Sequence, residues 1–316
     1  MKPLTGKDKG KMPKSPWTSS LRWILGLFVL VSTPAALGAA CCGGSVAAPA
    51  MISGDEKAQA SVSIGESQIH ADVTTSGFFR ERQSLETQRT YQLDVAHIFH
   101  DRWQAGGRIK LLDRNREGSS SQGLGDSDFN LGYEYLPDWD YNPIRPKGLG
   151  FLQLTLPSGR SIYESQNDFQ LDSRGRGFWA LGLGTLLSKT WERWDTSILL
   201  SIHRSLSKSI STSSGPAELH PGWGGSLATD AGFSWRSFRL GAGANWSYED
   251  GVKQTGSSSS KSSPQRVATA VLSLSFAPSD SWTVMAAYQD QTWLGQPTNT
   301  TVSRGGEVRL VRRWSR

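Results

Sequence analysis

The sequence lacks the features that mark several large protein classes. Its only two cysteines, Cys41 and Cys42, are adjacent, and neighbouring cysteines cannot staple a chain of 316 residues, so a disulfide-rich scaffold is excluded. Beyond the N-terminus no apolar run approaches the ~20 residues of a membrane-spanning helix, which excludes a multi-helix membrane protein. Aromatic residues make up 10% of the chain, and this excludes a disordered protein because disordered segments avoid them.

Net positive charge is nearly absent from most of the chain. The formal net charge is +6, but residues 1–22 hold six basic residues and one acidic residue, which leaves only +1 for residues 23–316. Nucleic-acid-binding domains usually carry a basic patch or stripe, so no nucleic-acid partner is expected. Histidines are also scarce, and His97 and His100 fall on different faces of a strand, so we expect no metal and no other cofactor.

The N-terminus has the pattern of an export signal. A basic stretch is followed by nine apolar residues, Trp23 to Val31, and by small residues over 35–40. This order predicts a signal peptide over residues 1–40, followed by a periplasmic segment over 41–57. Cleavage before Cys41 makes that residue a candidate for lipidation; the alternative is ordinary cleavage that leaves a free Cys-Cys end.

From residue 58 onward, apolar and polar residues alternate in runs of ten or more. In 238–249, one face reads Phe, Leu, Ala, Ala, Trp, Tyr, and the other reads Arg, Gly, Gly, Asn, Ser, Glu. Such alternation predicts strands, and its length matches the ~9–11 residues of a tilted transmembrane strand. Twelve strands are expected, near 58–72, 88–99, 103–113, 125–136, 147–157, 176–189, 194–206, 223–235, 238–249, 265–277, 282–291 and 302–314.

The connections between these runs alternate in length. Tight turns follow the second, sixth, eighth and tenth runs, whereas long polar segments follow the odd-numbered ones, as at 158–175 and 250–264. Transmembrane barrels have short periplasmic turns and longer extracellular loops. We therefore predict an all-β fold over 58–316: an antiparallel transmembrane β-barrel of about 12 strands in the bacterial outer membrane. The barrel-assembly machinery is an expected partner of this fold class.

Tryptophans support the same interpretation. Outer-membrane barrels carry aromatic girdles at both membrane interfaces. Seven tryptophans fall at or near predicted strand ends: Trp103, Trp191, Trp194, Trp235, Trp246, Trp282 and Trp314.

Three glycine-rich segments carry a family resemblance. They are Gly-Leu-Gly-Asp at 123–126 with the strand to 135, Gly-Phe-Leu-Gln-Leu-Thr-Leu-Pro-Ser-Gly at 150–159, and Gly-Leu-Gly-Thr-Leu-Leu-Ser-Lys at 182–189. Over about 123–206 the series resembles the outer-membrane transporter-like family named for the meta-pathway of phenol degradation. The resemblance implies an outer-membrane barrel that transports small molecules.

If the apolar strand face meets lipid, the polar face lines the interior. Both charge signs are present there, so the lining predicts either a narrow polar path or a lumen bridged by ion pairs. The lumen-facing candidates are Gln104, Arg108, Lys110, Asp128, Asn130, Glu134, Gln153, His203, Asp230, Arg239, Asn245, Glu307 and Arg309.

Three functions fit this prediction. The first is a channel or transporter in which small, hydrophobic or aromatic molecules diffuse, with outer-membrane lipid and a small solute as partners. The second is a structural barrel with a plugged lumen and loops that bind a partner. The third is a hydrolase, because His203 and Ser205 share a face as in the His-x-Ser-Asn motif of outer-membrane phospholipases. Leu206 replaces the orienting Asn, so we expect no enzyme; the oligomeric state stays open.

Overall fold

The computed structural model describes residues 49–315 except 141, 213–214 and 257–258. The predicted signal peptide and the lipidation candidate Cys41 lie outside these residues. Twelve long strands form the wall: β1 (Glu56–Val73), β2 (Phe79–Phe99), β3 (Trp103–Arg116), β5 (Ser127–Leu136), β6 (Lys147–Leu156), β7 (Ala180–Trp191), β8 (Trp194–Ser205), β11 (Trp223–Trp235), β12 (Phe238–Glu249), β15 (Gln265–Ser279), β16 (Trp282–Asp290) and β17 (Thr300–Ser315).

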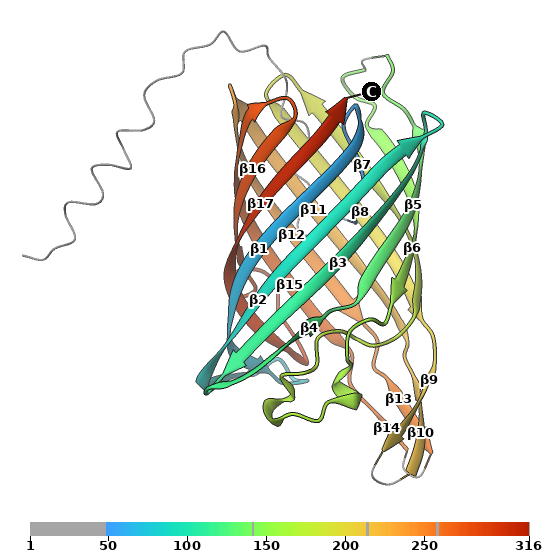
Figure 1. Ribbon diagram of the computed structural model, residues 1–316, viewed down its shortest axis with the longest axis vertical. Helices are drawn as coiled ribbons and strands as arrows, with labels where there is room; N and C mark the ends of the chain where they lie inside the picture. The colour runs from blue at the N-terminus through green and yellow to red at the C-terminus, as the bar shows by residue number, and fades with distance from the viewer. Residues whose placement is uncertain (1–48, 141, 213–214, 257–258, 316) are drawn as a thin grey trace, which may run out of the picture. The chain divides into compact units, whose positions relative to one another are not determined.

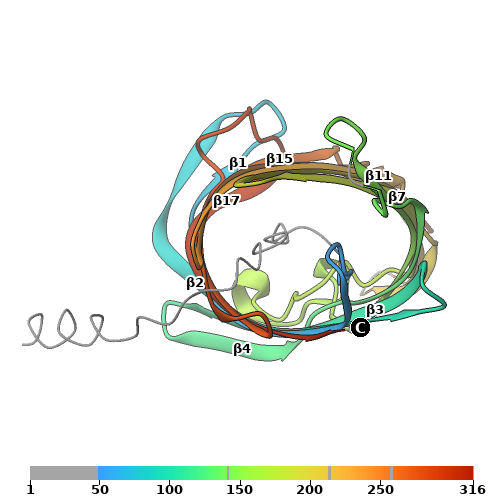
Figure 2. The same ribbon diagram turned by 90° about the horizontal axis from the view of Figure 1, so that it is seen from above.

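These strands close on themselves. Each pairs antiparallel with its neighbour along the chain, β1 pairs with β17, and β2 pairs with β3, so no open edge remains in the described wall. Figures 1 and 2 show the result from the side and down the axis. The predicted all-β, 12-stranded antiparallel barrel is confirmed.

Alternation of side chains explains why these runs form a wall with two different faces. In β5 the exposed Phe129, Leu131 and Tyr133 alternate with the buried Asn130 and Glu134. Because successive side chains of a strand point to opposite faces, one face of the wall is apolar and the other polar. The apolar face is the outer one, as expected for a barrel in lipid.

The two ends of the barrel differ. At one end the strands are joined by turns such as His100–Arg102 and Arg236–Ser237, and the start of β1 and the end of β17 lie there. Six of the predicted girdle tryptophans are at this end and are 38% to 59% exposed: Trp103, Trp191, Trp194, Trp235, Trp282 and Trp314. Trp246 lies toward the other end, near the exposed Trp179 and Trp223 at strand starts. Outer-membrane barrels have their short turns on the periplasmic side, and we name the two ends of this barrel by that rule.

The extracellular end contains more strand than the sequence predicted. The segment 73–87 was expected to be a loop, but β1 and β2 run for 18 and 21 residues. The register of β1 with β2 places Glu66, which interrupts the apolar face of β1, in an exposed ion pair with Arg89. The segment 114–123 was likewise expected to be a loop and is instead a hairpin of β3 with β4 (Ser119–Leu124).

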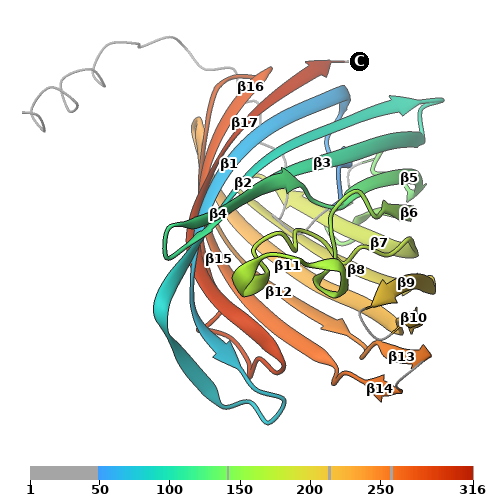
Figure 3. The same ribbon diagram turned by 60° about the horizontal axis from the view of Figure 1, so that its bottom comes forward.

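Two further loops pair with each other. They form a four-stranded sheet of β14 (Ser260–Lys261), β13 (Lys253–Gly256), β10 (Gly215–His220) and β9 (Lys208–Thr212). Figure 3 shows this sheet beyond the end of the barrel wall.

Candidate functional site

The barrel interior is the candidate site. Of the thirteen sequence-predicted residues, seven are buried in the structure: Gln104, Arg108, Asn130, Glu134, Asp230, Arg239 and Arg309. Five line a cavity in the interior: Lys110, Asp128, Gln153, His203 and Glu307. Asn245 is partly buried.

The cavity has a volume of about 610 Å³. Residues from nearly every strand of the wall line it, together with Arg174, Arg176 and Phe178 from the segment between β6 and β7. The lining includes five glutamines and three threonines, together with charged side chains such as Lys110, Asp128 and Glu307. The cavity can therefore hydrogen-bond a small solute from several sides.

A short N-terminal segment, residues 49–55, occupies the periplasmic part of the interior. The Gln104 side chain binds its backbone twice, because Ile52 N donates to Gln104 Oε1 at 2.6 Å and Gln104 Nε2 donates to Ile52 O at 3.0 Å. Lys147 Nζ also donates to Gly54 O at 3.3 Å. We call this segment the plug; sequence reasoning assigned it to the periplasm because short Ala- and Gly-containing stretches give no sign of where they dock.

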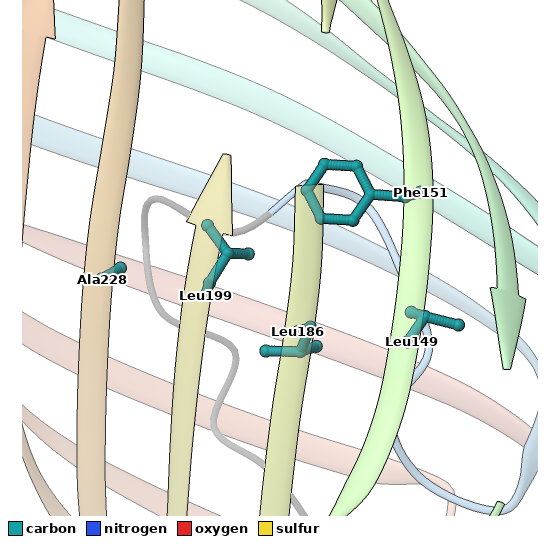
Figure 4. Close-up of a cluster of buried hydrophobic side chains, with 5 residues drawn as sticks. All are labelled: Leu149, Phe151, Leu186, Leu199 and Ala228. Carbon is teal, nitrogen blue, oxygen red and sulfur yellow. The ribbon is translucent and has the colours of Figure 1, made fainter. Parts of the chain in front are cut away.

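An apolar cluster receives the plug. Leu149, Leu186, Leu199 and Ala228 lie directly opposite one another on four adjacent strands, and Phe151 lies beside them (Figure 4). Met51 of the plug packs against this cluster. The inner face is thus not uniformly polar, in contrast to the sequence prediction.

The extracellular mouth is narrowed by the segment 157–179, which we call the mouth loop. It contains two short 3-10 turns, Ile162–Glu164 and Asp168–Gln170, and these lie within the outline of the barrel in Figure 2. Asp126 holds both ends of the loop, because its carboxylate accepts backbone N–H bonds from Gly159 at 3.1 Å and from Arg176 at 2.6 Å. Arg176 then reaches across to Glu249 at 2.5 Å.

Asp172 stabilises the mouth loop from within. Its carboxylate is buried and accepts bonds from the Ser165 hydroxyl, the Gln166 backbone N–H and the Arg160 guanidinium. Burial alone would raise the pKa of Asp172, but these donors outweigh it and hold the pKa below its ordinary value. The folded loop therefore depends on this carboxylate being charged.

Ion pairs cross the inner face at two levels. Near the periplasmic end Arg239 pairs with Asp195 at 2.5 Å and also with Asp230. Further up, Arg108 pairs with Asp94 of the neighbouring strand at 2.6 Å, and Arg309 pairs with Glu307 of its own strand at 2.8 Å. Sequence reasoning missed Asp94 and Asp195, although period-two alternation places both on the polar face of their strands.

The predicted His203–Ser205 pair has a different environment from a catalytic dyad. His203 Nε2 lies 3.1 Å from Glu249 and 3.0 Å from Arg176 Nη1. Ser205 is buried, and no hydrogen bond joins it to His203 in the described part of the chain. Among the same residues, no group of three or more His, Cys, Asp or Glu side chains could hold a metal ion.

The fold was compared with solved structures. An outer membrane channel from Pseudomonas putida F1 superposes with a TM-score of 0.66 at 13% sequence identity, over 82% of this chain and 96% of that chain. The β-domain of the Bordetella autotransporter BrkA has a TM-score of 0.44 at 12% identity, over 82% of this chain and 100% of that chain. No family model and no curated protein sequence matches the chain. The first similarity shows that the chain has an outer-membrane β-barrel fold.

Proposed function

We propose that this protein resides in the bacterial outer membrane and lets small molecules diffuse through its lumen. The observation that carries the proposal is the polar cavity of about 610 Å³ inside a closed barrel. Cavities of roughly 300–1,000 Å³ suit small ligands. The structure from Pseudomonas putida F1 that shares the fold is itself described as an outer membrane channel.

The lining favours solutes that form hydrogen bonds. Glutamine and threonine side chains offer both donors and acceptors, and Leu112, Phe178 and Ala180 add apolar surface. A hydroxylated aromatic molecule would use both parts of this lining. This agrees with the family resemblance, which is the basis for expecting hydrophobic or aromatic solutes.

The plug is the gate of the proposed path. Gln104→Ala removes both hydrogen bonds to Ile52, so the plug should leave the lumen more often. In planar bilayers the variant is expected to conduct severalfold more than the wild type. Gln88→Ala is the control, because Gln88 lines the cavity and has no hydrogen bond to the plug among the described residues.

Solute passage is measured by swelling of liposomes that contain the protein, with a sugar and a phenol as probes. If neither the wild type nor Gln104→Ala gives solute-dependent conductance or swelling, the channel proposal is overturned. The structural barrel then becomes the better function, since its lumen would be bridged by ion pairs such as Arg108–Asp94.

A further inference from the structure

An apolar groove lies on the outer wall, away from the lumen. Its volume is about 500 Å³, and it spans β8, β11, β12 and β15. Leu200, Leu227 and Trp246 lie directly opposite one another across three of these strands, and each is more than a third exposed. The groove is thus part of the lipid-facing surface.

Gly225 forms the floor of the groove. In the next row toward the extracellular end, Ile202 and Tyr248 flank Gly225 on the adjacent strands. A side chain at Gly225 would meet the Ser201 carbonyl oxygen at 2.8 Å, so the wall has a hollow where its neighbours have large side chains. Gly295, from the connection between β16 and β17, lies against Ala268 and closes one side.

Two arginines stand at the extracellular rim of this groove. Arg266 lies opposite Tyr248, with its guanidinium 5.7 Å from the ring centroid, and Arg204 lies opposite Trp223 at 5.5 Å. Neither guanidinium forms an ion pair with any carboxylate of the described chain. Two exposed cations therefore stand above an apolar hollow at the level of the aromatic girdle.

We propose that this groove binds lipid A, the phosphorylated and multiply acylated lipid of the outer leaflet. An acyl chain fills the hollow over Gly225, and the phosphates pair with Arg204 and Arg266. Guanidinium groups recognise phosphate with paired, charge-assisted hydrogen bonds. The proposal uses the membrane orientation of the barrel but does not depend on passage of any solute.

The spacing of the arginines favours lipid A over a glycerophospholipid. β8 and β15 are separated by three strand-to-strand steps, which places the two backbones about 14 Å apart. A lipid with one phosphate offers a single anionic group to the two cations. A disaccharide headgroup with a phosphate at each end offers one anionic group to each.

Binding can be measured on the full chain in detergent by native mass spectrometry with lipid A as the probe. The test variant is Arg204→Gln with Arg266→Gln, and we expect it to lose affinity by about tenfold or more. The matched control is Arg236→Gln with Arg312→Gln, because these residues pair with Trp235 and Trp282 in the same way at the periplasmic end. The control should bind lipid A as the wild type does.

Two further measurements test the two arginines and the apolar hollow separately. Dephosphorylated lipid A should bind the wild type and the arginine variant equally, and phosphatidylglycerol should bind the wild type more weakly than lipid A. Leu227→Trp, which fills the hollow, should weaken lipid A binding while both arginines remain. Three results would overturn the proposal. One is equal lipid A affinity of the wild type and the arginine variant, and another is an equal loss of lipid A affinity in the control variant. The third is binding of phosphatidylglycerol to the wild type as tightly as lipid A.

Discussion

Arg239 is a buried cation held between two buried carboxylates. Its guanidinium is 1% exposed and pairs with Asp195 and Asp230. Removing one partner of a buried ion pair leaves an uncompensated charge and typically costs about 3–5 kcal/mol. We expect Arg239→Met to lower the free energy of unfolding by this amount, as measured by urea titration with tryptophan fluorescence.

A variant without charges at this site distinguishes the loss of the Arg239 ion pairs from the loss of side-chain packing. Adding Asp195→Asn and Asp230→Asn to Arg239→Met should restore a large part of the stability, since no buried charge then remains. Arg236→Gln, at an exposed turn position, should change stability little. A loss below about 1 kcal/mol for Arg239→Met would show that water already compensates the two carboxylates.

Sequence reasoning identified inner-face residues but not their partners. Period two places Arg239 and Asp230 on the polar face, yet the pairing of Arg239 with Asp195 depends on the register of three strands. Register is set by contacts along whole strands, so it cannot be derived from one residue. The apolar inner residues Leu149 and Leu199 were missed because the plug that covers them has no pattern of its own.

The mouth loop is an element whose stability should depend on pH. The pKa of Asp172 is lowered in the folded loop, so its contribution is complete above the unfolded value of about 3.9 and is lost as the pH falls through the lower folded value. We expect no change from about pH 7 to about pH 5 and a loosened loop below about pH 4. Leu171, which is buried, then becomes open to pepsin.

Pepsin digestion followed by mass spectrometry measures this loosening. Asp172→Asn should be cut at Leu171 already at about pH 4.5, where the wild type resists. Asp280→Asn, at an exposed turn of the opposite end, serves as control and should resist like the wild type. Equal cleavage of wild type and Asp172→Asn at that pH would show that Asp172 does not hold the loop.

Among the secondary-structure elements, the long strands of the wall could be predicted from the sequence, whereas the short strands of the extracellular loops could not. Twelve runs of period-two alternation correspond to the twelve strands of the wall, because lipid on one side and polar groups on the other impose that period. The β3–β4 hairpin turns at Glu117 and Gly118, which both adopt positive φ, and Glu-Gly is a weaker hairpin signal than Asn-Gly or Asp-Gly. β9 has a single apolar residue, Ile210, and the alternation in β10 covers too few residues to stand out from a loop.

The lumen of the barrel is narrowed at both ends. The plug fills the periplasmic side through Gln104, and the mouth loop narrows the extracellular side through Asp126. Two constrictions along one path act as resistances in series. The larger resistance therefore hides changes in the smaller one, and the plug, which fits among packed apolar side chains, is the larger.

This arrangement predicts that the effect of releasing the mouth loop on conductance depends on whether the plug is in place. Asp126→Ala, which releases the mouth loop, should raise bilayer conductance only slightly in the wild type, because the plug still limits flow. In the Gln104→Ala background the same change should raise it severalfold. Single-channel recordings of the wild type, both single variants and the double variant measure the difference. Equal ratios in both backgrounds would mean that the plug does not lie on the path, and that solutes pass beside it.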